Sequence, residues 1–287
     1  MSAIYRKELK IYFSSAFGFV LMALLLLFAG AFTVVFNMVL LMADFALALD
    51  PMKLVLILVV PLLTMRSIAE ERHSHTDQLL YSLPLRLRDI VLGKFLAMLT
   101  VFLIPTVVTA LYPLLLSTMG STSIASAYTA LFGYFLMGAA LIALCTLVSS
   151  LVENQIVAVA LSIGVCLLLY FSDLLIPVLP ASGLVSYLLF VAFILLLGLV
   201  ICILSRNLWV GGGAALLFLL PLTLCYLIKP AMFASLFSDF LNAINLFSRQ
   251  IGFSYGYFDL GGTVFYLTVI VLCLFLTVQS MEMRRRG

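Results

Sequence analysis

Apolar residues run along this chain in eight long stretches, each of which is a candidate membrane-spanning helix. A bilayer core of about 30 Å requires about 20 apolar residues in a helix. Long charge-free runs favour helices over a β-barrel, whose strands would be short and would alternate apolar with polar residues. The pattern predicts spans at Ala16–Leu41, Met52–Met65, Phe95–Met119, Ala127–Val152, Gln155–Leu175, Leu184–Ser205, Leu208–Ile228 and Leu260–Ser280. We therefore expect an all-α integral membrane protein, a polytopic bundle of about eight transmembrane helices.

The second stretch is the weakest of the eight. Its charge-free part runs only from Leu54 to Met65 and contains Pro61. It crosses the bilayer only if Lys53 extends to the headgroups or the bilayer thins locally. A re-entrant segment remains the alternative for this stretch.

Composition supports the membrane assignment. Hydrophobic residues make up 65% of the 287 positions and charged residues 9%, and the mean hydropathy is +1.29. These values lie far outside the range of soluble domains. The five cysteines all fall inside apolar runs without CxxC spacing, which favours small buried hydrophobes over disulfides or metal ligands. No cleavable signal peptide is apparent, because the first apolar run is too long for one.

The distribution of basic residues predicts the orientation. With eight spans and the N-terminus inside, twelve Lys and Arg residues fall on the inner side and three, Lys53, Lys229 and Arg249, on the outer side. Short cytoplasmic loops carry such an excess of positive charge. We therefore expect a multi-pass protein of the bacterial cytoplasmic membrane with both termini in the cytoplasm.

Two segments outside the spans have amphipathic patterns. Residues 1–15 mix apolar and basic side chains, which predicts an interfacial amphipathic helix, although an ordinary anchor beside the first span explains them equally well. The extracytoplasmic segment 229–259 is rich in Phe and Tyr. It is predicted to form a packed cap or a half-inserted helix hairpin, or its aromatic side chains only anchor helix ends at the interface.

Residues 66–94 concentrate charge in an otherwise apolar chain. Ser74 followed by Asp77 is typical of a helix start, and Pro84 ends the helix. The pattern thus predicts a short helix over 75–82 whose apolar side carries Leu79, Leu80 and Leu83. So short a helix requires a partner surface or the lipid interface. The alternative is a solvated basic loop that binds anionic lipid.

The run from Thr64 to Ala97 resembles the first cytoplasmic loop of ABC-2-type transporter permeases. That loop has an EER sequence, a nearby Thr, a Leu-rich turn, LP and a VLGK-like entry into the next span. The corresponding residues here are Glu70-Glu71-Arg72, Thr76, Leu79-Leu80, Leu83-Pro84 and Val91-Leu92-Gly93-Lys94. The N-terminal IYRKELKIYFSS resembles the interfacial helix of the family, and the last span resembles that of its gliding-motility-type branch.

The resemblance fails in the middle of the chain. Members of that branch usually have six spans, whereas this sequence reads as eight. The extra helix pair would be residues 184–228, whose role the sequence does not indicate. We nevertheless expect residues 1–287 to form a single ABC-2-type transmembrane domain.

The resemblance implies that the loop contains a coupling helix seated on a cytoplasmic ABC ATPase dimer. Its contact residues would be Glu70, Glu71, Arg72, Thr76, Asp77, Leu79, Leu80 and Leu83. It also implies an exporter that pairs with a second copy or a related permease. ATP and magnesium would be bound by the ATPase, because this chain has no GxxxxGK[ST] sequence. We expect no cofactor on this chain and no nucleic-acid partner, but contact with membrane lipids.

An accessory subunit outside the cytoplasm is a further expected partner. If one is present, its predicted contacts on this chain are Phe233, Phe237, Phe240, Phe247, Tyr255 and Tyr257.

Other functions have less support in the sequence. His73 and His75 beside Glu70 and Glu71 would bind a metal only in an extended loop, and the spans contain no Ser with a nearby base for proteolysis. A carrier driven by an ion gradient usually has an ionisable residue at mid-membrane, whereas Glu153 and Asp173 lie at span ends. This carrier and a non-transporting assembly protein remain the alternatives, and the cargo is not indicated.

Overall fold

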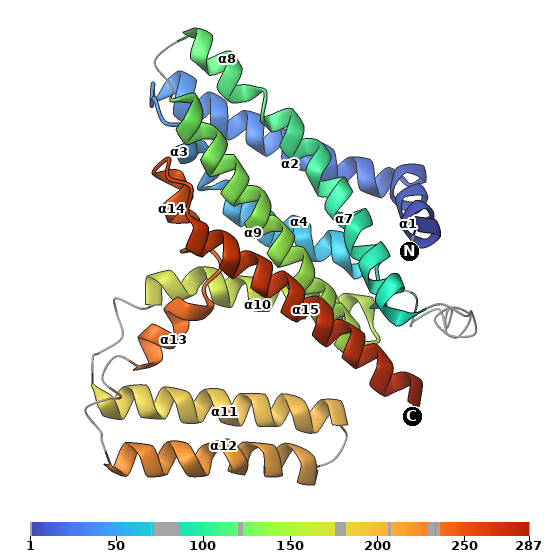
Figure 1. The fold of residues 1–287 in the computed structure, drawn as a ribbon, viewed down its shortest axis with the longest axis vertical. Coiled ribbons are helices and arrows are strands. Elements are labelled where there is room, and N and C mark those ends of the chain that lie inside the picture. Colours follow the sequence, from blue (N-terminus) through green and yellow to red (C-terminus); the bar gives the residue numbers. More distant parts are fainter. Residues whose placement is uncertain are drawn as a thin grey trace. The chain divides into compact units, whose positions relative to one another are not determined.

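The computed structural model describes residues 2–69, 71, 86–119, 123–175, 182–205, 208–228, 233 and 236–286. Within these ranges the chain is helical, without β-strands (Figure 1). It divides into two compact units, the first formed by Met1–Leu168 and Leu246–Gly287 and the second by Leu169–Asn245. The all-helical fold confirms the predicted class.

All eight predicted spans coincide with helices. Five helical stretches in the described part of the chain are long and apolar enough to cross a membrane: Ala16–Val39, Leu87–Thr118, Ile124–Leu151, Gln155–Ser172 and Leu260–Met283. The other three predicted spans correspond to shorter apolar helices over Met52–Met65, Gly183–Leu195 and Ala215–Ile228. The protein is therefore a multi-pass membrane protein.

The first unit holds most of the helices. They are α1 (Ser2–Ser14), α2 (Ala16–Thr33) with its π-helical continuation η1 (Val34–Val39), α3 (Ala46–Leu49), α4 (Met52–Met65), α7 (Leu87–Thr109), α8 (Tyr112–Met119), α9 (Ile124–Leu151), α14 (Gln250–Ser254), α15 (Leu260–Arg286) and the first part of α10 (Gln155–Leu175).

Helix α9 forms the centre of the first unit. It packs against α4, α7, α14 and α15 (Figure 1). Its buried positions are rich in small residues, including Gly133, Gly138, Ala139, Ala140 and Ala143. In a membrane the lipid is as apolar as the helices, so helices associate mainly by close packing. Small side chains allow the helix backbones to approach closely. The composition of α9 thus explains why the other helices gather around it.

The short helix α14 inserts Phe253 between α9 and α15. The Phe253 side chain is fully buried, and it occupies space that side chains at Gly133 and Gly262 would need. A Cβ atom at Gly133 would lie 2.6 Å from Cγ of Phe253, and one at Gly262 would lie 2.8 Å from its Cε2. Nearby, the Tyr266 hydroxyl donates to the Leu246 carbonyl at 2.7 Å. These contacts hold residues 246–258 on the ends of two spans.

The second unit contains α11 (Gly183–Ser205), α12 (Leu208–Ile228), α13 (Leu236–Ile244) and the end of α10. Helices α11 and α12 pack as an antiparallel pair (Figure 1). Aromatic rings connect the pair and α13: Tyr187 stacks on Tyr226 at 4.5 Å between centroids, and Phe190 meets Phe237 edge-on at 5.1 Å. Asn245 donates to the Ser172 hydroxyl at 2.9 Å.

We expect Gly133→Ala to destabilise the first unit by about 1–3 kcal/mol, the usual cost of overpacking, because its methyl group would overlap the Phe253 ring. Thermal unfolding in detergent measures this change. Gly164→Ala is the matched control, since no atom lies within 4 Å of a Cβ placed there, and alanine is favoured over glycine inside a helix. Equal melting temperatures for the two variants would contradict this account of the packing.

Candidate functional site

Four charged side chains meet where α1, the residues after α4 and the start of α7 come together. The Lys94 ammonium lies 2.8 Å from Oε1 of Glu71 and 3.1 Å from Oε1 of Glu8. It also donates to the Ser67 carbonyl at 2.5 Å. Lys7 approaches Glu71 at 3.4 Å and Glu8 at 3.9 Å. We call Lys7, Glu8, Glu71 and Lys94 the ionic cluster.

The ionic cluster is largely buried. The side chain of Lys94 is 1% exposed, that of Glu8 6% and that of Glu71 15%, whereas Lys7 is 52% exposed. An ammonium group has three hydrogens to donate, and Lys94 has three acceptors: two carboxylates and one carbonyl. Two acidic and two basic groups also balance in charge. A buried charge is tolerated when it is paired and hydrogen-bonded in this way.

The sequence places Glu8 on the buried side of α1. The buried residues of that helix are Ile4, Glu8 and Tyr12, which recur at intervals of four and so share one face. Tyr12 donates its hydroxyl to the Leu63 carbonyl at 2.9 Å, and Tyr5 bonds Thr100 at 3.0 Å. Helix α1 is therefore docked on α4 and α7 by polar contacts from one side.

Lys94 lies on the buried side of α7. Its neighbours one turn away on that helix, Ile90, Val91, Ala97 and Met98, are all buried. The aliphatic part of a lysine can pack along such an apolar face while its ammonium group extends to charged partners at the end of the helix bundle. Lys94 lies shortly after α7 begins at Leu87. It therefore connects α7 to Ser67 and Glu71, which precede residues 72–85.

The residues between α4 and Glu71 are also fixed. The Ala69 amide donates to the Ser149 hydroxyl of α9 at 3.2 Å, and the Arg66 guanidinium lies 4.2 Å above the Phe17 ring. At the same end of the first unit, Ser280 of α15 donates to the Ser150 carbonyl at 3.4 Å. The ionic cluster thus lies at the end of the unit that also receives α1 and the last turns of α15.

Of the predicted coupling-helix residues, the structure describes Glu71 alone, and it places Glu71 in the ionic cluster. Glu70, Arg72, Thr76, Asp77, Leu79, Leu80 and Leu83 lie outside the described residues, as does the predicted helix over 75–82. His73 and His75, which would bind a metal only in an extended loop, lie there too. Within the described residues, no group of three or more His, Cys, Asp or Glu side chains lies together as a metal site would require.

Sequence reasoning assigned Glu8 and Lys94 no specific role. It grouped Glu8 with the polar residues of an interfacial helix and Lys94 with the basic residues of the inner side. One signal in the sequence was available: Glu8 interrupts the face that Ile4 and Tyr12 define, and an acid on an apolar face requires a basic partner. The identity of that partner needed the fold.

The predicted aromatic contacts divide by unit and by exposure. In the first unit Phe247 is buried, whereas Tyr255 and Tyr257 are 74% and 75% exposed. They flank Gly256, which turns the chain with a φ of +80° just before α15 begins. In the second unit Phe233 is buried, and Phe237 and Phe240 pack on Phe190. Of these six residues, Tyr255 and Tyr257 are the best placed for an outside contact.

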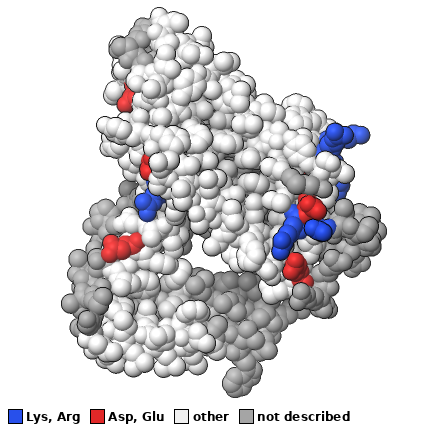
Figure 2. All heavy atoms as spheres, in the orientation of Figure 1, with Lys and Arg blue, Asp and Glu red and all other residues white. Residues whose placement is uncertain are grey.

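Among the described residues on the face visible in Figure 2, charged side chains are confined to a few small groups. A surface this poor in charge suits contact with lipid. The three largely buried charges of the ionic cluster, on Glu8, Glu71 and Lys94, are therefore an exception among the described residues. Charged groups inside a membrane protein are costly and usually have a structural or functional role.

We expect Lys94→Met to destabilise the protein by about 3–5 kcal/mol, because it leaves two buried carboxylates without their buried cation. Lys7→Met is the control: its exposed side chain should contribute less than about 1 kcal/mol. Unfolding in detergent compares the two. Adding Glu8→Gln and Glu71→Gln to Lys94→Met should restore part of the loss, and no recovery in the triple variant would contradict the pairing.

One family model matches the chain, that of the ABC-2 family transporter protein, over residues 42–183. No curated protein and no solved structure matched. The matched part contains the residues on both sides of the charged loop, with Glu71 and Lys94, and it ends at Gly183, where α11 begins. The helix pair α11–α12 lies beyond it, and the resemblance to the gliding-motility-type branch stays a prediction. Together with the apolar, all-helical fold, this match over residues 42–183 supports an ABC-2-type transporter permease.

Proposed function

We propose that the chain is the transmembrane permease subunit of an ATP-driven ABC exporter. In this proposal a separate cytoplasmic ATPase dimer binds ATP and magnesium, and the permease moves substrate across or out of the membrane. The family match supports the transport role. The observation that carries the coupling to an ATPase is the ionic cluster, because it joins both ends of the loop that resembles a coupling helix.

The ionic cluster fixes the loop at its two ends. Glu71 precedes residues 72–85 and Lys94 follows them, and the two side chains are 2.8 Å apart. Glu8 adds α1 to the same contact at 3.1 Å. A partner that pushes on the loop therefore acts on α1, α4 and α7 together. Packed helices respond to such a load by moving as rigid bodies rather than by deforming continuously.

The loop sequence suits a protein partner. Leu79, Leu80 and Leu83 supply apolar side chains for a groove, and Glu70, Arg72, Thr76 and Asp77 supply polar groups for its rim. We place this loop, the ionic cluster and both chain termini on the cytoplasmic side of the bacterial inner membrane, because the excess of Lys and Arg in the short loops falls there.

The permease would work as half of a pathway, paired with a second copy or a related permease. On the opposite side, Tyr255 and Tyr257 are the exposed aromatic residues that an accessory subunit would contact. Membrane lipid is the other occupant for these rings, since Tyr is enriched at the membrane interface.

We expect an ATPase to co-purify with the chain from its native membrane and to be lost with Leu79→Asp or Leu80→Asp. The loss should be at least about tenfold, the effect of removing about 1.4 kcal/mol of binding free energy. The measurement is ATPase recovered per permease, after size-exclusion chromatography has shown that the variants are folded. Arg88→Gln is the control, because this exposed residue lies on α7 beyond the loop.

Two outcomes would count against the proposal. One is recovery of the same amount of ATPase with both Asp variants. The other is transport by vesicles that contain this chain alone and carry an ion gradient, which would identify a secondary carrier instead.

A further inference from the structure

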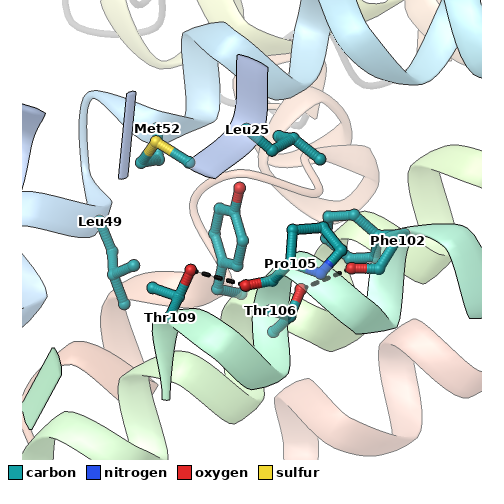
Figure 3. A pocket seen from close by; sticks show the side chains of 8 residues that line it. Leu25, Leu49, Met52, Phe102, Pro105, Thr106 and Thr109 are labelled. Carbon is teal, nitrogen blue, oxygen red and sulfur yellow. Dashed lines mark hydrogen bonds between the residues drawn. The ribbon is translucent and has the colours of Figure 1, made fainter. Parts of the chain in front are cut away.

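Pro105 lies inside helix α7, close to the C-terminal end of the helix at Thr109. Proline has no amide hydrogen, so the carbonyl of Val101, one turn earlier, loses its usual helical partner. Beside Pro105 lies a small cavity (Figure 3). It is lined by side chains from α2, α3, α4, α7 and α9: Leu25, Leu49, Met52, Phe102, Pro105, Thr106, Thr109 and Tyr134.

One wall of the cavity is polar. Thr106 donates its hydroxyl to the Phe102 carbonyl at 2.9 Å, and Thr109 donates to the Pro105 carbonyl at 2.8 Å (Figure 3). Both hydroxyl oxygens keep lone pairs that can accept a hydrogen bond. Tyr134 also lines the cavity, and Leu25, Leu49 and Met52 contribute apolar side chains to it.

Tyr134 is the residue that requires an explanation. It is only 4% exposed, and within the described part of the chain its hydroxyl has no hydrogen-bond partner. The other deeply buried tyrosines are satisfied: Tyr12 donates to Leu63 and Tyr266 to Leu246. A buried hydroxyl without a partner is costly, and it is usually satisfied by protein or by ordered water.

The size of the cavity indicates the ligand. Its free space is about 10 Å³, which is close to the minimum of about 10–15 Å³ that one water molecule requires. A buried water also needs two to four polar partners. Tyr134 as a donor, with the Thr106 and Thr109 oxygens as acceptors, provides three, whereas a larger ligand would have to displace the packed side chains.

We propose that this cavity binds a single water molecule beside Pro105 of α7. The water accepts a hydrogen bond from Tyr134 and donates to the hydroxyl oxygens of Thr106 and Thr109. Proline is a recognised cause of bending in a helix, and so is water that inserts among the helical hydrogen bonds. The site therefore makes α7 bendable near Pro105, about three turns from Lys94 at 5.4 Å per turn.

Radiolytic hydroxyl-radical labelling of the purified protein, read by mass spectrometry, tests for the water. Radicals form from water and oxidise the side chains beside it, so Met52 and Phe102 should be labelled although they are 3% and 2% exposed. Met98 and Met137 are the internal controls, because they are fully buried on α7 and α9 and do not line the cavity. Labelling of Met52 and Phe102 no higher than that of the controls would overturn the proposal.

Tyr134→Phe separates a held water from leakage of solvent. The variant removes one oxygen and keeps the ring, so labelling of Met52 and Phe102 should fall to the level of Met98. Tyr266→Phe, which removes a hydroxyl that is bonded elsewhere, should leave it unchanged. Unchanged labelling in Tyr134→Phe would show that the hydroxyl holds no water. The experiment requires neither an ATPase nor a substrate, so its outcome is independent of the proposed transport function.

Discussion

The buried ammonium group of Lys94 is the constraint on which one end of the first unit depends. Its three hydrogen bonds join α1 through Glu8, the turn after α4 through Ser67, and the start of the charged loop through Glu71. Each partner comes from a different segment, and none of the acids would be stable at its position without the lysine. The arrangement of these segments is therefore determined by electrostatic pairing, whereas small residues on α9 determine the packing farther along the bundle.

Helix α7 connects the two polar features of the first unit. It carries Lys94 near its start and Pro105 near its end, and it packs on α1, α2 and α9. Between these positions its buried residues are all apolar: Phe95, Ala97, Met98, Val101 and Phe102. A displacement at the loop would reach the Pro105 region through one continuous stretch of helix. The glycine at position 138 of α9 accommodates the Phe102 ring there, so the neighbouring helix allows close approach in the turn before Pro105.

The positions of the helices could be predicted from the sequence because each span must be long and apolar to cross a bilayer. Even the weakness of the second span was predicted, since Lys53 and Pro61 limit its apolar length, and α4 is one of the shorter helices. The ionic cluster could not be predicted, because pairing Glu8 with Lys94, 86 residues away, depends on how the helices fold against each other. The cavity was likewise invisible, since Pro105, Thr106 and Tyr134 acquire a common role only where α7 meets α9. For the loop over 72–85 the sequence remains the source of the coupling hypothesis.

The separation of Glu8 and Lys94 along the chain also has a consequence for biosynthesis. The acid at position 8 leaves the ribosome long before the lysine at position 94, and α2 and α4 are made in between. Until α7 has entered the membrane, Glu8 has no buried cation to neutralise it and is most stable in the aqueous headgroup region. Helix α1 would then dock only after α7 is in the membrane, so it would be the last of α1, α2, α4 and α7 to reach its final position.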